Sequence, residues 1–502
     1  MKNPDRLFTI TAAALSGLYI VVRFWGLTDS CLWFDEIFGV HAAELPTDDM
    51  LWFVAQDLIH PPLFYLLLKA WISFGGESLF WLRGFSVFWS IAALAPFLLL
   101  CKEIKLRFSA RLVALAFFAV NGALIKYAQE VRMYGLLLFL SLVSTWLFAR
   151  YFYRGKSIWT LTFVNVLLVY THYFGWFVVA SEITVILMMQ RIKIRHMLVM
   201  FSILVTSYAP WVWAIIQAGS GPNVQQNIGW IEKPGLRALL DLGFDVIEPF
   251  YFQQSNGEPT TILFVTFPLL VAVAIAKVSY FVTWRKRAVG TTIFVLAVLS
   301  LLPLVLALIV SWVFPFSIWG TRHLIVVFPV MMIVIGVLID SVEPKVGKVA
   351  LIAFVSLLFC TALAFRVNAP KPDFIWCAWE QQAAALSGDV PRTVYVFEDL
   401  VAYHMWFAVR KEPNIHIVKV DGVPEMKEDK AYFLPRGFDS VSRRDLSQIS
   451  EREVTLVFRA TELKLSEPPL KNFAYSGYSI STAGEYDADG QKSFVVKLDK
   501  AN

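Results

Sequence analysis

Long apolar runs, separated by short clusters of basic residues, make up most of this sequence. Hydrophobic residues account for 57% of the 502 residues and charged residues for only 17%, whereas soluble domains contain about 25% charged residues. Several runs approach the ~20 apolar residues that a helix needs to cross a bilayer. The sequence therefore predicts an all-α polytopic membrane protein.

The basic clusters predict the orientation of the spans, because Lys and Arg are enriched in cytoplasmic loops. Clusters follow alternate runs, at 102–111, 154–156, 191–195, 285–287 and 345–348. Lys2 and Arg6 precede the first run, which has no clear cleavage site and is interpreted as a retained signal anchor. About eleven spans are expected, at 7–26, 79–101, 110–125, 135–152, 158–171, 174–190, 197–217, 261–283, 290–312, 323–340 and 349–365.

This orientation places the loops 27–78 and 218–260 on the outer face of the membrane. The apolar run 61–75 is too short to span and is expected to lie at the interface as a helix. If it crossed the membrane, the basic loop 102–111 would fall outside. Residues 1–365 are therefore predicted to form one transmembrane domain with outer-face loops.

The tail, 366–502, has a different pattern and is predicted to form a small extracytoplasmic α/β domain. Alternating β-branched and aromatic residues predict four strands, at 393–397, 415–420, 454–458 and 494–498. Helices are expected at 374–387 and 399–410. The tail contains no glycine-rich phosphate loop and no metal-ligand spacing, so binding or packing is expected there rather than chemistry.

The cysteines and the net charge exclude other classes. Cys31, Cys101, Cys360 and Cys377 have no CxxC or zinc spacing, so neither a metal site nor a disulfide framework is expected. The net charge of +5 is small, and the basic residues lie mostly between spans. That distribution indicates topology rather than nucleic-acid binding.

Two adjacent carboxylates, Asp35 and Glu36, stand among large apolar side chains in the stretch 33–41, just after the first span. One interpretation is an interfacial helix with its acids on the wet side. The other is a catalytic base that faces an aqueous cavity. Neighbouring residues on a helix point about 100° apart, so the two carboxylates are not expected to share one role.

Polar residues are rare but collect at the predicted outer ends of the spans, where they are costly unless they pair or line a wet cavity. The set consists of Asp35, Glu36, His41, His60, Glu130, Arg132, His172, Arg322 and His323. Their convergence predicts a single outer cavity. Structural alternatives remain: a Glu130–Arg132 ion pair, snorkelling of Arg322, and a hydrogen-bonded His172 within an aromatic belt. Glu182 and Lys277 are expected to satisfy helix contacts.

These motifs, in this order, resemble the GT-C membrane glycosyltransferases that use polyprenyl-phosphate sugars. Within that superfamily the chain looks most like the family 39 and protein-mannosyltransferase-like group, to which the aminoarabinose transferases are related. The resemblance covers about 1–365. The residues that carry it are Asp35-Glu36, the HPPL(Y/F)Y-like element His60-Pro61-Pro62-Leu63-Phe64-Tyr65, Arg83, Glu130, Arg132, Tyr134, the run Tyr170-Thr171-His172-Tyr173-Phe174-Gly175, Arg322 and Pro329.

The resemblance implies an inverting glycosyltransferase of the cytoplasmic membrane. Its donor would be a hexosyl, mannosyl or pentosyl group on a polyprenyl phosphate, and its acceptor a hydroxyl of a glycan, lipid or protein at the outer face. Asp35 would be the general base, with Glu36 orienting it, and Arg322, Arg132 and Arg83 would hold the donor phosphate. The pocket would be lined by His60, Glu130, Tyr134, His172, Tyr173 and His323.

The resemblance also implies that no cofactor is required. A divalent metal held by Glu36, His60 and His172 remains an open alternative, since some relatives hold a metal near the first outer loop. One departure bears on the substrate. Aminoarabinose-type transferases carry Glu-Lys before the paired prolines, whereas this chain has Ile59-His60, which weakens the case for that sugar.

Two other classes of function compete with this one. A transporter or flippase would place charged residues near the bilayer midplane and often shows internal repeats, whereas here the charges lie at the outer face and no repeat is found. A non-catalytic assembly or polysaccharide-binding protein would use the tail as its functional part. Release of polyprenyl phosphate on addition of an acceptor would distinguish the enzyme from both.

Overall fold

The computed structural model describes residues 4–189, 194–219, 229–250, 261–283, 290–369, 374–423, 426, 431–488 and 490–500. The chain divides into two compact units. The helical unit comprises Met1–Leu27 and Leu58–Pro370, and the mixed unit comprises Thr28–Asp57 and Lys371–Asn502.

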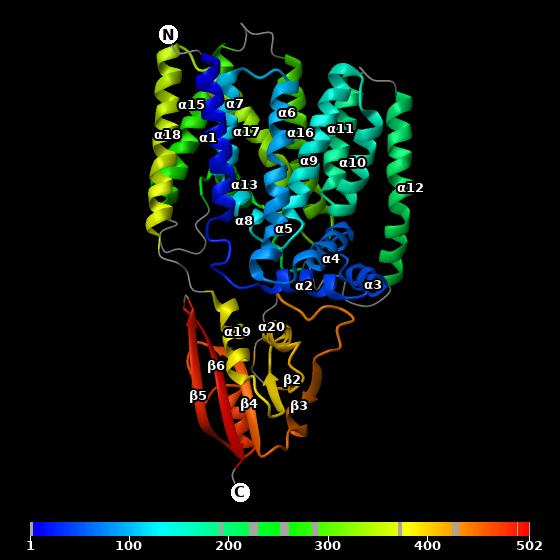
Figure 1. The fold of residues 1–502 in the computed structure, drawn as a ribbon, viewed down its shortest axis with the longest axis vertical. Helices are drawn as coiled ribbons and strands as arrows, with labels where there is room; N and C mark the ends of the chain where they lie inside the picture. The colour runs from blue at the N-terminus through cyan, green and yellow to red at the C-terminus, as the bar shows by residue number, and fades with distance from the viewer. Residues whose placement is uncertain are drawn as a thin grey trace. The chain divides into compact units, whose positions relative to one another are not determined.

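The helical unit is a bundle of long helices (Figure 1). Its helices are α1 (Pro4–Phe24), α4 (Leu63–Gly75), α5 (Leu79–Ala92), α6 (Leu94–Glu103), α7 (Phe108–Val120), α8 (Gly122–Ala128), α9 (Tyr134–Arg154), α10 (Ile158–Thr171), α11 (Gly175–Met189), α12 (Ile194–Ala218), α13 (Leu236–Ile247), α15 (Phe267–Thr283), α16 (Gly290–Val313), α17 (Phe328–Asp340) and α18 (Lys345–Asn368), with a π-helix η1 (Ile262–Thr266) and a 3-10 helix η3 (Leu324–Val327). Each predicted span contains a helix.

In the described part of the chain, six helices are long and apolar enough to cross a membrane. The prediction of a multi-span helical membrane protein is thus confirmed, while the number of about eleven spans stays a prediction. The run 61–75 forms α4, a helix of 13 residues, which is short for a span as expected.

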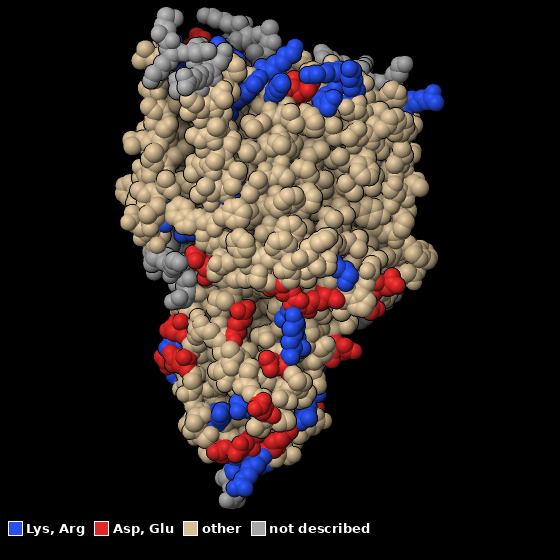
Figure 2. Space-filling model, viewed as in Figure 1, with Lys and Arg blue, Asp and Glu red and all other residues tan. Residues whose placement is uncertain are grey.

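Lys and Arg gather at one end of the helical unit, and the face below that end carries few charges (Figure 2). Ion pairs at this end of the bundle include Arg154 with Glu103 at 2.5 Å and Asp340 with both Lys348 at 3.1 Å and Arg107 at 3.7 Å. The predicted basic clusters at 191–193 and 285–287 lie outside the described residues. By the distribution of basic residues this end is expected to be cytoplasmic.

Small residues allow neighbouring helices to approach each other closely. A Cβ at Gly135 would lie 2.4 Å from the Ser86 carbonyl oxygen on α5, and one at Gly336 would lie 2.4 Å from that of Ala110 on α7, so glycine permits these close approaches.

Glu182 on α11 accepts hydrogen bonds from Ser144 (2.6 Å) and Asn165 (2.8 Å) on the neighbouring helices. The helix contact expected of Glu182 is thereby confirmed. Lys277, in contrast, is exposed on α15, so the expectation that it is held between helices is wrong.

The mixed unit contains one sheet of six strands in the order β3-β2-β1-β4-β6-β5. The first four strands in this order pair in parallel. β6 pairs antiparallel with β4, and β5 pairs antiparallel with β6. The strands are β1 (Arg392–Val396), β2 (Ile415–Asp421), β3 (Ser442–Asp445), β4 (Glu453–Ala460), β5 (Tyr478–Ala488) and β6 (Gln491–Lys500). The helices are α2 (Phe34–Glu44), α3 (Thr47–Asp57), α19 (Ile375–Leu386), α20 (Asp399–Val409) and α21 (Leu470–Tyr475). All four predicted strands and both predicted tail helices are present.

The sheet has a hydrophobic core on each face, because successive side chains of a strand point to opposite sides. Val394 and Val396 of β1 belong to the core that includes Trp379 of α19 and Met405 of α20. Tyr395, between the two valines, belongs to the other core, with residues of β4, β6 and α21. The tail therefore folds as the predicted small α/β domain.

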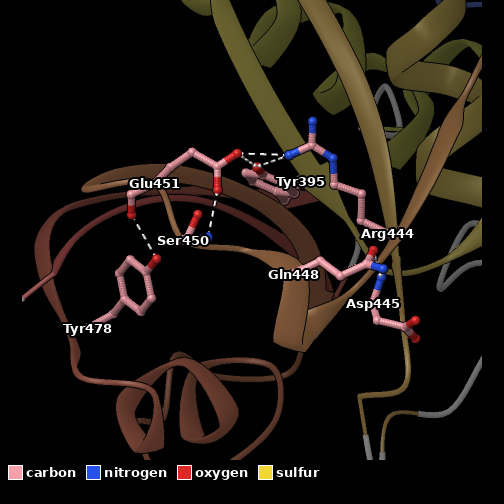
Figure 3. A network of polar contacts seen from close by, with 7 residues as sticks. All are labelled: Tyr395, Arg444, Asp445, Gln448, Ser450, Glu451 and Tyr478. Carbon is pink, nitrogen blue, oxygen red and sulfur yellow. Dashed lines mark hydrogen bonds and ion pairs between the residues drawn. The ribbon is translucent and has the colours of Figure 1, made fainter.

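A polar network closes one end of the sheet (Figure 3). The Glu451 carboxylate accepts hydrogen bonds from Tyr395 and Arg444, each at 2.8 Å, and from the Ser450 backbone N–H at 2.9 Å. Its backbone carbonyl accepts from the Tyr478 hydroxyl at 2.7 Å. Burial would raise the pKa of Glu451, but these hydrogen bonds to the ionised form lower it below its ordinary value. The network ties β1, β3 and β5 to the start of β4.

Candidate functional site

The two predicted catalytic carboxylates lie in the first turn of α2, in the mixed unit. Glu36 is fully buried, and its carboxylate accepts a hydrogen bond from the Trp33 backbone N–H at 3.1 Å, which caps the helix. Asp35 is partly exposed. The neighbours therefore occupy different environments.

A disulfide joins Cys31, just before α2, to Cys377 in α19, with Cα atoms 5.2 Å apart. The expectation that the cysteines form no disulfide is wrong. The pair is separated by 346 residues, so no local spacing indicates it. The link belongs to a wider contact in which Thr28–Asp57 packs with the tail rather than with the helical unit.

Three of the predicted pocket histidines come together in the helical unit and are referred to as the histidine cluster: His60, His172 and His323. The ring centroids of His60 and His172 are 5.4 Å apart, and those of His172 and His323 are also 5.4 Å apart. His60 precedes α4, His172 ends α10, and His323 precedes η3. The chain thus brings three separate segments to one point.

Backbone groups fix the protons of two of these rings. His172 Nδ1 accepts a hydrogen bond from the Phe174 backbone N–H at 3.1 Å, so its proton lies on Nε2 when the ring is neutral. Nε2 is buried and has no hydrogen-bond partner among the described residues. His323 Nδ1 donates to the Ile318 carbonyl oxygen at 3.0 Å, so its Nε2 is an acceptor.

His60 and His172 are uncharged at neutral pH. Burial, together with the nearby Arg132, His323 and Arg322, lowers the pKa of His60 and His172 well below the ordinary value. The positive charge of this region therefore resides on its arginines.

Two arginines flank the cluster. Arg132 is buried, and its Nη2 lies 3.4 Å from His60 Nδ1. Arg322 is partly exposed, and its guanidinium lies 5.4 Å from the centroid of the Trp230 ring, in the range of a cation–π contact. The pair provides guanidinium forks of the kind that fit phosphate oxygens.

Of the remaining predicted pocket residues, Tyr134 lies near the histidine cluster, Glu130 contacts Arg132, and Tyr173 contacts the residue at which the chain re-enters the helical unit. The buried Tyr134 ring has its centroid 6.5 Å from that of His172, and the Glu130 carbonyl accepts a hydrogen bond from the Arg132 backbone N–H at 2.7 Å. Tyr173 donates to the Leu58 carbonyl at 3.2 Å.

Arg83, predicted as a phosphate ligand, donates to the Leu27 carbonyl at 2.9 Å. Leu27 and Leu58 are the residues at which the chain leaves and re-enters the helical unit. The observed bonds of Arg83 and Tyr173 therefore hold these two crossings in place.

Sequence reasoning missed the support around Arg322. The Thr321 hydroxyl donates to the Asp245 carboxylate near the end of α13, and Asn121 donates to the Asp245 carbonyl at 2.8 Å. Burial raises the pKa of Asp245. A polar face on the helix 236–247 is the signal that could have indicated this contact. The turn before α8 and the loop helix α13 together position the segment that carries Arg322.

No group of three or more His, Cys, Asp or Glu residues in an arrangement that could hold a metal ion is found within the described ranges. A metal held by Glu36, His60 and His172 stays an untested alternative, and no step below depends on one.

Comparison of the sequence with protein-family models and with curated proteins finds no match. Comparison of the fold does. The structure of ArnT from Cupriavidus metallidurans bound to undecaprenyl phosphate matches with a TM-score of 0.56 and 10% sequence identity, over 96% of this chain and 97% of that one. The apo form of that ArnT matches with a TM-score of 0.55 and 11% identity, over 98% of each chain. Along nearly its whole length, the chain therefore shares the fold of that ArnT.

Proposed function

We propose that this chain is a membrane glycosyltransferase that moves a sugar from a polyprenyl-phosphate donor to an acceptor hydroxyl. The observation that carries the proposal is the convergence of His60, Arg132, His172 and His323. The family resemblance assigns Arg132 to the donor phosphate, and His60, His172 and His323 to the substrate pocket, from their motifs alone. The fold likeness to an ArnT bound to undecaprenyl phosphate supports the same class of donor.

The chemistry of this region suits a phosphate. Arg132 and Arg322 carry fixed positive charge, and Arg132 occupies the acceptor lone pair of His60. The neutral His60 and His172 rings then each carry their proton on Nε2 and are hydrogen-bond donors there. Guanidinium and N–H donors can bind the donor phosphate and stabilise the charge that develops on it as the bond to the sugar breaks.

Asp35 is the proposed general base. It takes the proton of the acceptor hydroxyl as that oxygen bonds to the anomeric carbon, while the bond from that carbon to the phosphate oxygen breaks and its electron pair leaves with polyprenyl phosphate. One displacement inverts the anomeric centre. Glu36 is committed to capping the Trp33 backbone N–H, which supports the choice of its partly exposed neighbour. Base assistance contributes about 10²–10⁴-fold to such a rate.

The proposed location is the cytoplasmic membrane, with the mixed unit on its outer face. The Cys31–Cys377 disulfide supports this side, because disulfides form and persist in oxidising compartments rather than in the cytosol. A polyprenyl-phosphate sugar suits a reaction at that face. The proposed donor sugar is a hexose, such as mannose, or a pentose, and the acceptor is a glycan, a lipid or a protein.

The test uses the purified chain in nanodiscs with synthetic polyprenyl-phosphate sugars. Release of polyprenyl phosphate that depends on an added acceptor is expected for the native chain, and its loss in the Asp35→Asn variant. Binding of the donor without release under any donor–acceptor combination would contradict the proposal and favour a flippase. The chemical difference between envelopes of cells with and without the chain would identify the acceptor.

A further inference from the structure

The α2 helix, which carries Asp35, is held to the C-terminal part of the mixed unit at its start and through its last turn. The contacts come from α19, α20 and the segment after β2, although more than 300 residues separate them from α2 in the sequence. The mixed unit therefore contains a joint between the first loop of the chain and its tail.

At the start of α2 the joint is covalent. Cys31 lies four residues before Asp35 and is bonded to Cys377 near the start of α19. The ring of Phe34, the residue next to Asp35, packs with its centroid 5.1 Å from those of Tyr403 and Tyr432. Asp35 thus directly follows a segment that a disulfide and a buried aromatic contact hold in place.

In the last turn of α2, His41 Nδ1 lies 2.9 Å from the Tyr403 hydroxyl of α20. The His41 ring also packs against Trp406, with centroids 4.7 Å apart. Burial, with Arg410 nearby, lowers the pKa of His41 to about 4, so the ring is neutral at physiological pH. A neutral ring can be buried here without a carboxylate partner.

At the end of α2, the Glu44 carboxylate receives hydrogen bonds from two nitrogens of Arg410. Nη2 lies 2.7 Å from Oε1, and Nε lies 3.2 Å from both carboxylate oxygens. The side chains are only 24% and 17% exposed, so the pair is less screened than a surface ion pair. A guanidinium–carboxylate fork of this kind restricts direction as well as distance.

We propose that the tail serves as a positioning scaffold for the general base, with Cys31, Cys377, Glu44 and Arg410 as positioning residues that act through α2 on Asp35. This inference rests on the proposed function for the role of Asp35. A helix of 11 residues is only marginally stable on its own, and a displacement of about 1 Å at a reacting group can cost about 10²-fold in rate. The tail thereby gains a function that its sequence does not indicate.

The first experiment removes the covalent end of the joint. The Cys31→Ser/Cys377→Ser double variant is compared with Cys360→Ser, which removes an exposed free cysteine of α18. The double variant is expected to lose about 10-fold or more in kcat. Its KM for the donor should stay within about twofold, since the proposed donor residues belong to the helical unit. A reductant should lower kcat of the native chain and of Cys360→Ser alike and leave the double variant unchanged.

The second experiment exchanges the charges at the other end of α2. Glu44→Arg and Arg410→Glu should each lower kcat about as much as loss of the disulfide does, and the double exchange should restore most of it. Recovery of kcat in the double exchange is expected only if the two residues interact with each other. If each substitution simply damaged the fold, the losses of kcat would add up in the double variant. Failure of the double exchange to recover, with both single variants folded, would overturn the role of this pair.

Hydrogen exchange over 34–44 separates this inference from the proposed function, because it needs no activity. Faster exchange of α2 in the reduced native chain than in the oxidised chain is expected. Native kcat and unchanged exchange in the cysteine double variant, with an inactive Asp35→Asn variant, would overturn the scaffold and leave the glycosyltransferase standing. Faster exchange of α2 on reduction, in a native chain that transfers no sugar, would confirm that the tail holds α2 but would overturn the enzyme and with it the role of α2 in positioning a base.

Discussion

Arg132 donates from Nη2 to His60 Nδ1 over 3.4 Å, which places a permanent cation against a neutral imidazole. Both side chains are only 4% exposed. Because arginine has no acceptor, the His60 proton must lie on Nε2. Burial and Arg132 lower the pKa of His60 well below its ordinary value. The charge for binding a donor phosphate is therefore supplied by the arginines at every physiological pH, and the histidines add directed hydrogen bonds.

The first prediction concerns the arginine fork. Arg322→Lys keeps the charge but removes the bidentate geometry, so donor affinity should fall about 10-fold or more with normal expression. Equilibrium binding of a polyprenyl-phosphate sugar in nanodiscs measures this. Arg366→Lys is the matched control, because Arg366, on α18, also lies over a tryptophan ring, which is that of Trp25. Native affinity in Arg322→Lys would assign the phosphate to Arg132 or Arg83 instead.

A second prediction follows from the depressed pKa values of His60 and His172. A bound phosphate next to these rings should raise their pKa values, so the complex should take up protons on formation as the pH falls. Donor affinity should consequently increase as the pH falls from 7.5 to 5.5. Calorimetry in two buffers of different ionisation enthalpy counts these protons, and a sugar phosphodiester donor adds no titration of its own.

His172→Phe should take up fewer protons than the native chain because one titrating ring is removed. Binding that is independent of pH, with no proton uptake at pH 5.5, would show that the phosphate does not approach these rings.

The inner strands of the sheet could be predicted from sequence and the edge strands could not. The four predicted strands are β2, β1, β4 and β6, which are the inner strands in the sheet order and show alternating or continuous apolar residues. The missed strands, β3 and β5, are its two edges. All four residues of β3 are exposed, as are most of those of β5. An edge strand with both faces wet has no apolar pattern for the sequence to reveal.

The candidate site was predictable in the part that depends on polar residues next to hydrocarbon. Polar side chains are costly at span ends unless they pair or line a wet cavity. The positions of His60, His172 and His323 relative to the apolar runs can be read from the sequence alone. The Cys31–Cys377 bond and the packing of 28–57 with the tail could not be predicted, because both join segments that are distant along the chain. The role of Asp245 was missed for the same reason, since its contacts with Thr321 and Asn121 form only in the folded chain.

A third prediction concerns acid stability. Burial lowers the pKa of His41 to about 4 and that of His404 to about 3, below the ordinary value of about 6.5 that they regain on unfolding. The unfolded chain then binds more protons than the folded chain below pH 6.5. Stability is fully present above that pH and is lost as the pH falls toward 4.

The midpoint of thermal unfolding should therefore drop between pH 7 and pH 5. The drop should be smaller in His41→Phe, which keeps an aromatic ring but cannot titrate. His416→Gln is the control, because His416 is exposed on β2 and should leave the pH dependence as it is. An equal drop in His41→Phe and in the native chain would show that His41 is not its source.

The fourth prediction tests the orientation. Ser157, in the turn between α9 and α10, follows the basic residues 154–156 and should be cytoplasmic. Ser476, in the turn before β5, should be outside with the rest of the tail. In intact cells an impermeant thiol reagent should label Ser476→Cys and spare Ser157→Cys, in a background that lacks Cys360. Ser255, another position expected outside, lies beyond the described residues. An exchange of the two labelling results would invert the whole span assignment.

The last prediction separates the two carboxylates at the start of α2. Asp35→Asn keeps the shape and hydrogen-bonding capacity of the side chain but cannot take a proton at neutral pH, so turnover should fall by about 10²-fold or more. Donor affinity should be retained, because the proposed phosphate ligands lie in the helical unit. Glu36→Gln keeps an oxygen that can accept from the Trp33 backbone N–H, so it should cost much less. Both variants are measured for acceptor-dependent release of polyprenyl phosphate and for donor binding in nanodiscs. Full activity in Asp35→Asn would eliminate the proposed mechanism, and an inactive Glu36→Gln beside an active Asp35→Asn would move the base to Glu36.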